Sequence, residues 1–263
     1  MMDEIQTYLG ADGLMHCTVC KEPVEAFYPK GSLLEMRMHH RQCACERKAY
    51  AEEAQYYKEK EHRELIARNK KICFEEKEME GFTFQNVERD SGVIRIAEEY
   101  VTNWQKMKQN HMGYLFWGPV GTGKSYLAAC IANALLEQEV TVKMTNFNTI
   151  LNDLFAAEDK TEYIRLLNGY ELLIIDDLGV ERSSEYALEN IFSVIDWRYR
   201  SGKPLIITTN LPLAQLKQET KIEKKRIYDR ILERCVPVKI DGVSRREAMA
   251  NDNMQTMKSI LKI

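Results

Sequence analysis

The sequence predicts an α/β fold, with a parallel sheet between helices, that follows a small zinc-binding domain and a helical linker. Short apolar runs alternate with helical patterns from residue 81 onward, one run ends in a glycine-rich loop, and four of the seven cysteines lie within the first 45 residues. Strands of a parallel sheet that is covered on both faces read as continuous apolar runs. We therefore expect a zinc-binding domain at 1–48, a charged helical linker at 49–80 and the α/β domain at 81–263.

Composition excludes some classes of function. The chain has 263 residues, with 37 Lys and Arg against 40 Asp and Glu and a net charge of −3, so it is not a nucleic-acid binder that depends on net positive charge. A local basic groove remains compatible with that balance. No apolar run approaches the roughly 20 residues that span a bilayer, and residues 1–10 lack a signal-peptide profile. We expect a soluble, cytoplasmic protein.

Hydrophobic patterning places the elements of the α/β domain. The expected strands are short apolar runs at 114–117, 140–145, 171–176, 203–210 and 236–240. The expected helices have apolar residues at helical spacing and lie at 93–108, 125–137, 148–157 and 183–200, with charged helical sequence continuing to about residue 235. Ser183 or Ser184 is a suitable N-cap for the last of these helices, and Gly202 follows its end.

A phosphate-binding loop follows the first strand of the α/β domain. Residues 118–125, GPVGTGKS, match G-x-x-x-x-G-K-[ST] between a strand and a helix. Glycines let the backbone turn its N–H groups inward, and the helix adds its positive N-terminal end. Lys124 is expected to contact the β- and γ-phosphates, and the Ser125 hydroxyl to bind Mg²⁺. The predicted nucleotide contacts are nine consecutive residues: Gly118, Pro119, Val120, Gly121, Thr122, Gly123, Lys124, Ser125 and Tyr126.

Two further polar groups follow buried strands. Asp176 and Asp177 come directly after the apolar run 172–175, and Asn210 ends the run 203–210. We expect Asp176 to act through the magnesium ion and Asp177 to polarise the attacking water. Paired acids that cap the next helix are the alternative. Asn210 is an ordinary turn residue by itself, but beside the two other motifs it is a candidate to hold the water or the γ-phosphate.

These motifs, together with Tyr228-Asp229-Arg230 and residues 242–246, resemble the DnaC/DnaI-type loaders of the bacterial replicative helicase. Those loaders share an AAA+ core with the IstB-type transposition helper ATPases. The resemblance covers about residues 82–246. It implies an AAA+ P-loop NTPase core in which the strand before Asn210 lies between the P-loop strand and the Asp176 strand.

The resemblance also implies roles for single residues. Lys124 and Ser125 correspond to Walker A, Asp176 and Asp177 to Walker B, and Asn210 to sensor 1. Arg230 resembles an arginine finger that reaches the ATP of a neighbouring subunit, and Arg246 resembles the sensor 2 arginine. Nearby arginines compete for these two roles: Arg226, Arg234 and Arg245. Many AAA+ proteins carry Glu where Asp177 stands, so ATP hydrolysis is expected to be weak and to depend on assembly.

The cysteine cluster predicts a structural zinc site. Cys17 and Cys20 form a C-x₂-C pair, and Cys43 and Cys45 form a C-x-C pair after a loop of about twenty residues. Such pairs converge on one tetrahedral Zn²⁺, and a domain this small needs a metal to stay folded. Unligated or redox-active thiols are the alternative, and three histidines could each replace one thiol: His16, His39 and His40. Cys130 and Cys235 are expected in the core.

The resulting hypothesis is an ATP-dependent loader of a DnaB-type replicative helicase onto single-stranded DNA during replication initiation. Its cofactors are ATP or ADP, Mg²⁺ and Zn²⁺, its zinc domain contacts the helicase, and its copies associate through the ATP site. Several helicase loaders carry a cysteine-bearing N-terminal domain that the IstB type generally lacks. Lys143, Phe147 and the helix after them are DNA-contact candidates by position alone, and a plain amphipathic helix is the favoured alternative for that segment. Two alternatives stay open: a transposition helper that binds duplex DNA, and a nucleotide-sensing adaptor with negligible turnover.

Overall fold

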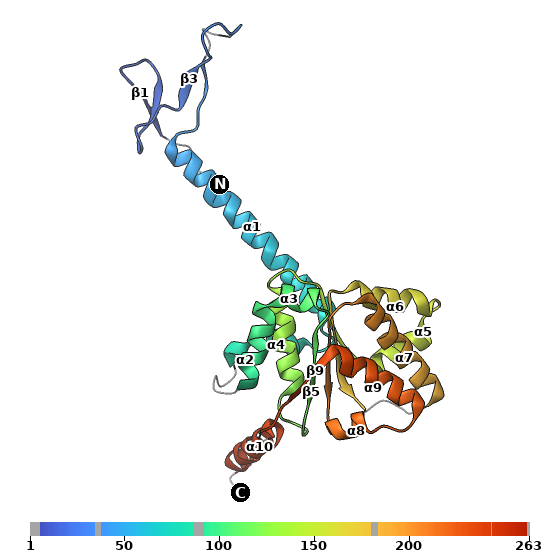
Figure 1. The fold of residues 1–263 in the computed structure, drawn as a ribbon. Helices are drawn as coiled ribbons and strands as arrows, with labels where there is room; N and C mark the ends of the chain where they lie inside the picture. The colour runs from blue at the N-terminus through green and yellow to red at the C-terminus, as the bar shows by residue number, and fades with distance from the viewer. Residues whose placement is uncertain (1–5, 35–37, 87–91, 180–183, 243, 262–263) are drawn as a thin grey trace. The chain divides into compact units, whose positions relative to one another are not determined.

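A computed structural model describes residues 6–34, 38–86, 92–179, 184–242 and 244–261, without the side chains of 86, 245–249, 251 and 252. The chain divides into two compact units, Met1–Leu65 and Ile66–Ile263. Figure 1 shows the elements of both. The three-part division into 1–48, 49–80 and 81–263 stays a prediction.

The N-terminal unit contains two small antiparallel sheets and the start of a long helix. In the first sheet β1 (Thr7–Leu9) pairs with β2 (Met15–Cys17), and in the second β3 (Glu25–Phe27) pairs with β4 (Met38–His40). Helix α1 (Ala44–Cys73) begins in this unit and carries most of the charged segment. Its sequence is helical, as expected, but it buries only Ile66 and Cys73 along its length.

The larger unit is built on a five-stranded parallel sheet with the order β6-β7-β8-β5-β9. Its strands are β5 (Gly113–Trp117), β6 (Val142–Asn146), β7 (Leu172–Leu178), β8 (Leu205–Thr209) and β9 (Cys235–Lys239). The predicted order is confirmed, because β8, which precedes Asn210, lies between the P-loop strand β5 and the Asp176 strand β7. The carboxyl ends of these three strands therefore meet at one edge.

Helices cover both faces of this sheet (Figure 1). One side has α2 (Gly92–Thr102), α3 (Trp104–Gln109) and α4 (Lys124–Leu136). The other has α5 (Phe147–Ala156), α6 (Lys160–Gly169), α7 (Glu185–Ser201) and α9 (Ile222–Arg234). The unit is completed by the short helix α8 (Leu213–Lys217), the C-terminal helix α10 (Arg245–Leu261) and two 3₁₀ turns, η1 (Lys77–Gly81) and η2 (Phe84–Asn86).

Alternate residues of the central strands enter two separate apolar clusters. Leu172 and Ile174 of β7 join the cluster under α2 and α4, while Leu173 and Ile175 join the cluster under α5, α7 and α9. All four side chains are fully buried. This explains why the strand reads as an unbroken apolar run, since neither of its faces meets water.

Local sequence signals explain several helix boundaries. Ser184 is the N-cap of α7, where its hydroxyl accepts the Ala187 N–H at 3.2 Å, and Gly202 ends the helix with φ of 65°. The expected helix at 93–108 is interrupted at Asn103, which separates α2 from α3. Helix α6 was not predicted, although Asp159 caps it by accepting two N–H groups, from Thr161 and Glu162. None of the described helices combines the length and apolar character of a membrane span.

Candidate functional site

The loop between β5 and α4 has a backbone that favours glycine. Gly118, Gly121 and Gly123 have φ of 145°, 81° and 95°, a region that side chains with a Cβ rarely adopt. A Cβ on Gly118 would also lie 2.3 Å from the Ile240 carbonyl oxygen. The loop can therefore follow this path only with glycine at these positions, and it leads into α4 with the N–H groups of the first helical turn directed toward the loop.

Lys124 is the first residue of α4 and is 5% exposed. Its Nζ donates to the carbonyl oxygens of Gly118 at 3.1 Å and Pro119 at 2.7 Å. The ammonium group is thus held over the loop by the loop's own backbone. Neutral carbonyls bind a cation less strongly than a phosphate does, so an anion in this loop would compete with them.

Asp176 lies near the end of β7, and a residue on the central strand fixes its carboxylate. The Thr208 hydroxyl donates to Asp176 Oδ1 and accepts the Asp177 N–H at 2.9 Å. Burial raises the pKa of Asp176, while hydrogen bonds from Thr208 and Ser125 oppose that rise. A carboxylate and a hydroxyl therefore meet at this edge, and hard oxygen ligands of this kind suit Mg²⁺.

Asp177 and Asn210 lie together on the same edge. Asn210 Nδ2 donates to Asp177 Oδ1 at 3.4 Å. Asp177 has φ of 55°, uncommon for a residue with a side chain, and an irregularity in the pairing of β7 with β8 falls between Ile175 and Leu178. Such local strain is concentrated at functional sites, and here two consecutive carboxylates have different partners, Thr208 for Asp176 and Asn210 for Asp177.

A pocket of about 540 Å³ opens beside the P-loop. Eight of its lining residues belong to the predicted site or its neighbourhood: Val120, Gly121, Gly123, Lys124, Ser125, Tyr126, Asp177 and Asn210. The remaining lining residues come from the segment around η1: Glu76, Glu78, Met79 and Phe82. The structure therefore brings the P-loop, Asp177 and Asn210 to one cavity, with Asp176 bonded to Thr208 behind it.

The η1 wall was missed by sequence reasoning. The Phe82 ring stacks on Tyr126 with centroids 4.5 Å apart, and Asn133 Nδ2 donates to the carbonyls of Met79 at 2.8 Å and Phe82 at 3.0 Å. Only the aromatic residues beside Gly81 hinted at it. Met79 and Phe82 give this wall an apolar surface of the kind that packs against a nucleoside base, beside the carboxyl groups of Glu76 and Glu78. Thr208 was also missed, although a polar residue in the apolar run before Asn210 was a usable signal.

The three arginines of α9 lie apart from this pocket's described lining. Arg230 pairs with Asp196 of α7 at 2.8 Å, Arg226 lies 4.3 Å from the Phe192 ring centroid, and Arg234 lies over Tyr199. The predicted sensor 2 residue Arg246 and its rival Arg245 have side chains outside the described part of the structure. Their predicted roles therefore stay predictions.

The four N-terminal cysteines converge. The Sγ atoms of Cys17, Cys20, Cys43 and Cys45 all lie within 4.8 Å of one another, a spacing that four thiolates around one tetrahedral Zn²⁺ require. Backbone hydrogen bonds from Glu22 and Cys45 lower the pKa of Cys20 to about 6, whereas hydrogen bonding with Cys20 raises the pKa of Cys45 to about 11 and burial raises that of Cys43. Four thiols at this spacing are a donor set that fits zinc, which binds their thiolate forms.

The other thiols and the histidines lie elsewhere. His16 pairs with Asp12 at 2.9 Å and His40 with Glu46 at 3.1 Å, while His39 contacts backbone and Tyr28. The described metal-ligand group consists of the cysteines without these histidines. Cys130 and Cys235 are each 1% exposed, so their predicted core positions are confirmed.

The proposed DNA contact through Phe147 is wrong, because the side chain is 1% exposed and packs in the core. Phe147 begins α5 directly after β6, and its ring points into the cluster under α7. Lys143 donates to the Ile72 carbonyl oxygen at 3.1 Å. Position in the sequence was the only argument for these residues, and it could not distinguish a stacking platform from a core side chain.

The fold and the site together define a P-loop nucleotide-binding protein of the AAA+ type. The same conclusion follows from comparison with protein families, since residues 49–252 match the family described as IstB-like ATP binding protein. The chain belongs to the IstB-like family of ATP-binding proteins.

Relatives confirm the resemblance to helicase loaders. The chain is 29% identical over 149 residues to the replicative helicase loader DnaC of Escherichia coli (strain K12), which covers 55% of this chain and 58% of the relative. It is 23% identical over 192 residues to the replicative helicase loader DnaI of Bacillus subtilis (strain 168), covering 67% of this chain and 62% of the relative. The chain thus spans about three fifths of each of these relatives.

Solved structures agree in fold. A crystal structure of DnaI matches with a TM-score of 0.58 and 25% identity, over 68% of this chain and 99% of that one. A crystal structure of the DnaC helicase loader matches with a TM-score of 0.53 and 20% identity, over 63% of this chain and 100% of that one. The predicted AAA+ architecture is confirmed.

Proposed function

We propose that this protein is an ATP-dependent loader that places a DnaB-type replicative helicase on single-stranded DNA during replication initiation. The observation that carries the proposal is the convergence of Lys124, Ser125, Asp177 and Asn210 at the carboxyl edge of β5, β7 and β8, with Asp176 held by Thr208. Similarity to two proteins named replicative helicase loaders supports the choice of a replicative helicase as the partner.

The residues of this edge divide the chemistry among them. The P-loop backbone and Lys124 would hold the β- and γ-phosphates, and Ser125 and Asp176 would hold Mg²⁺, which would neutralise phosphate charge. Asn210 and Asp177 orient the attacking water. Asp177 is one methylene shorter than the glutamate common at this position, and its carboxylate is already bonded to Asn210, so turnover is slow. Nucleotide state then acts mainly as a switch.

The N-terminal unit is the proposed helicase-binding part. The four cysteines would hold a structural Zn²⁺, and that ion would cross-link two short sheets that have few apolar contacts of their own. Exposed apolar side chains remain available on these sheets and on the turns beside them: Leu9 and Phe27 on strands, Val19 and Leu33 in turns. Apolar and aromatic groups of this kind are typical of the centres of protein interfaces.

Association between copies completes the proposal. Arg230 of one copy serves the triphosphate of its neighbour, and Arg246 contacts phosphate within its own copy. A cation supplied in trans contributes mainly at the transition state, so hydrolysis depends on assembly while nucleotide binding does not.

A second candidate function is favoured by the family match itself. The IstB-like model covers residues 49–252, and IstB-type proteins include transposition helpers. In that case the partner would be a transposase on duplex DNA. The cysteine cluster favours the loader, because it forms a separate unit before the shared core. A nucleotide-sensing adaptor is the third possibility, and it differs by having no turnover in any assembly.

The test is capture of the host's replicative helicase on immobilised protein in ATP and in ADP. We expect helicase retention that differs between the two nucleotides, and no such difference with Lys124→Ala. Helicase loading is then read as helicase-dependent unwinding of a single-stranded circle that carries an annealed strand. Retention of a transposase without the helicase would establish the second function, and nucleotide-independent behaviour of the parent protein would contradict the first.

A further inference from the structure

Helix α9 carries a ladder of three arginines against aromatic rings of α7. Arg226, Arg230 and Arg234 are four residues apart, and so lie on one helical face. Arg226 and Arg230 lie 4.3 and 4.6 Å from the Phe192 centroid, while Arg230 and Arg234 lie 5.8 and 4.6 Å from the Tyr199 centroid. Each guanidinium therefore has an aromatic surface at a cation–π distance.

One carboxylate lies in the middle of this ladder. Asp196 comes four residues after Phe192 on α7, and the residue is 8% exposed. Its Oδ1 accepts from Nε and Nη2 of Arg230, both at 2.8 Å, and its Oδ2 accepts from Nε of Arg200 at 2.8 Å. A single negative charge thus lies between two guanidinium groups. The positive charge of the set is reduced but not cancelled.

The contacts of Arg230 orient its guanidinium without using all of its donors. Asp196 takes Nε and Nη2, and the Arg226 carbonyl oxygen accepts from Nη1 at 3.1 Å. Those described contacts engage three of the five N–H groups of a guanidinium, which leaves one on each terminal nitrogen. The side chain is 25% exposed. Two N–H donors, one on Nη1 and one on Nη2, therefore remain at the surface, and a pair of guanidinium donors of this kind binds phosphate oxygens.

We infer that Asp196 is a positioning residue, which holds the Arg230 guanidinium ready for the triphosphate bound by a second copy of this chain. The inference rests on the proposed function and deepens it. A free arginine must lose much rotamer freedom when it docks on phosphate, but Arg230 has lost that freedom on folding. Preorganised charge of this kind stabilises a transition state without rearrangement during the reaction.

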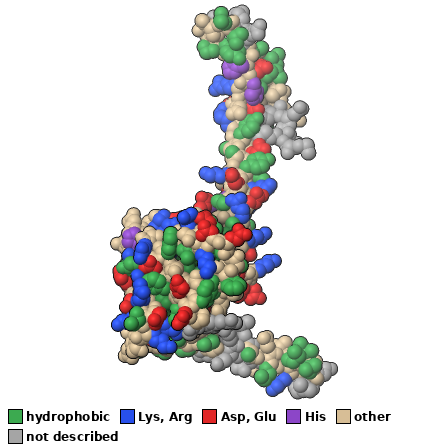
Figure 2. All heavy atoms as spheres, turned by 90° about the vertical axis from the view of Figure 1, so that its right-hand side faces the viewer, with side chains coloured by type: hydrophobic (Ala, Val, Ile, Leu, Met, Phe, Trp, Pro, Cys, Tyr) green, Lys and Arg blue, Asp and Glu red, His purple; other side chains and the backbone are tan. Residues whose placement is uncertain are grey.

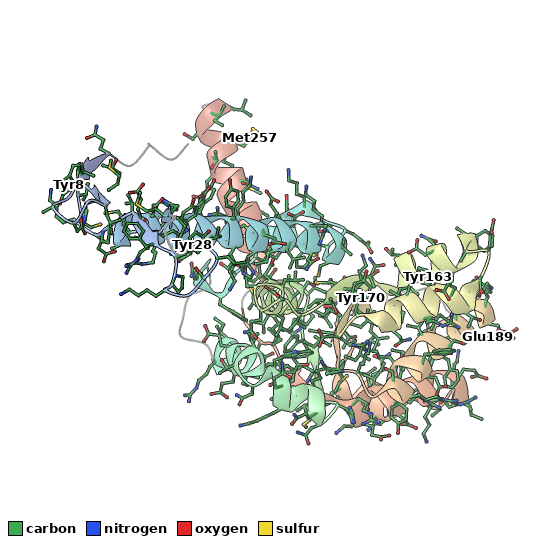
Figure 3. All side chains as sticks on the ribbon, turned by 90° about the horizontal axis from the view of Figure 1, so that it is seen from above. Tyr8, Tyr28, Tyr163, Tyr170, Glu189 and Met257 are labelled. Atoms are coloured by element: carbon green, nitrogen blue, oxygen red, sulfur yellow. The ribbon has the colours of Figure 1, made fainter. Side chains whose placement is uncertain are left out.

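The surroundings supply a control. Figure 2 shows basic and acidic side chains interspersed over the face that carries α5, α6, α7 and α9. Glu189, labelled in Figure 3, lies on α7 two helical turns before Asp196 and is exposed. Glu189→Gln removes a carboxylate from the same helix without touching Arg230. Asp196→Asn keeps the shape of the side chain but removes the charge that both arginines share.

The experiment compares four variants of the full chain in the assembled, ATP-hydrolysing state: Asp196→Asn, Arg230→Ala, Arg230→Lys and Glu189→Gln. We expect Asp196→Asn to bind a fluorescent ATP analogue within about twofold of the parent while kcat falls at least about tenfold. Arg230→Ala should lose more, and Arg230→Lys should not recover activity, since a lysine cannot form the side-on pair with Asp196. Glu189→Gln should match the parent.

Mixing experiments separate positioning from folding. A Lys124→Ala chain has a damaged P-loop but an intact Arg230. When it is mixed with Asp196→Asn, its Arg230 can serve the intact P-loop of the Asp196→Asn chain, so turnover should be restored. The mixture of Lys124→Ala with Arg230→Ala should recover turnover in the same way. Full activity of Asp196→Asn or of Arg230→Lys would overturn the inference. It would also be overturned if Lys124→Ala restored the turnover of Arg230→Ala but not that of Asp196→Asn. A parent chain that binds no ATP, or never hydrolyses it, would instead remove the proposed function and this inference with it.

Discussion

The two units of this chain are stabilised by different means. In the larger unit, Leu172, Leu173, Ile174 and Ile175 are fully buried between two layers of helices. In the N-terminal unit the described apolar cluster consists of Cys17, Val24 and Cys43, and the strands β1 and β4 are exposed along their lengths. A unit this small cannot offset chain entropy by apolar burial, so cross-linking by a metal is the available means.

The largest expected effect is loss of the N-terminal fold when the metal is removed. A strong chelator, or Cys17→Ser with Cys20→Ser, should unfold the small sheets because metal binding supplies nearly all of their folding free energy, about 10 kcal/mol for sites of this kind. The larger unit should keep its melting transition. Zinc content, with amide hydrogen exchange resolved by segment, measures both.

The matched control for metal removal is Cys130→Ser, which alters a thiol that lies in the core of the larger unit. It should lower the stability of that unit and leave zinc content unchanged. Unaltered hydrogen exchange of β1 to β4 after complete removal of zinc would show that the comparison between the two units is mistaken.

The reciprocal prediction concerns the apolar core. Leu154 of α5 is fully buried, so Leu154→Ala should destabilise the larger unit by about 3 kcal/mol through lost contacts and a residual cavity. Zinc content should not change. Leu166→Ala, at a residue that is 62% exposed on α6, should alter stability by less than about 0.5 kcal/mol. Calorimetry of both variants gives the difference, and equal effects would contradict the assigned burial.

The sequence predicts the larger unit better than it predicts the N-terminal unit. Every strand of the larger sheet was found, and for β7 and β8 the reason is that two covered faces leave an unbroken apolar run. Helix α6 was missed, since only Ile164 and Leu167 are buried in it and its signal is the cap at Asp159. In the N-terminal unit the cysteine spacing predicted the cluster, but strands of three residues have no periodicity to read.

The parts of the site that consist of consecutive residues were predicted from the sequence. The P-loop and the pair Asp176-Asp177 form local motifs, so their positions followed from the sequence. Thr208 and the wall formed by Met79 and Phe82 act through neighbours that are distant in the chain, and only the folded structure shows those contacts. The pairing of Arg230 with Asp196 joins two helices and was inaccessible for the same reason.

A smaller effect distinguishes site chemistry from folding within the larger unit. Thr208→Val keeps the volume of a buried side chain but removes the hydroxyl that donates to Asp176. We expect kcat to fall about tenfold, because the metal-binding carboxylate loses its orientation. The matched variant Thr209→Val removes a hydroxyl whose described hydrogen bonds go to backbone groups, at Leu178 and Leu211, and should affect stability more than turnover. Equal losses of turnover would remove the proposed role of Thr208.

The smallest expected effect has the opposite sign. Burial raises the pKa of Asp176, so the folded protein favours the protonated carboxyl, and the charged form destabilises the fold above the usual pKa of an aspartate. Asp176→Asn should therefore raise the melting temperature on the order of 2 °C at pH 7 without Mg²⁺, while Mg²⁺-dependent ATP binding falls. The gain should vanish near pH 3, and a melting temperature that falls at pH 7 would contradict this account.

The buried guanidinium of Arg198 makes one part of the larger unit insensitive to mild acid. The Arg198 guanidinium is 1% exposed and donates to the main-chain oxygens of Tyr170, Glu171 and Pro204, which precede β7 and β8. Peptide oxygens do not take up protons in mild acid, whereas the carboxylates of surface ion pairs do. Acidification that protonates the carboxylates of the surface ion pairs should therefore leave the hydrogen bonds between Arg198 and the starts of β7 and β8 intact.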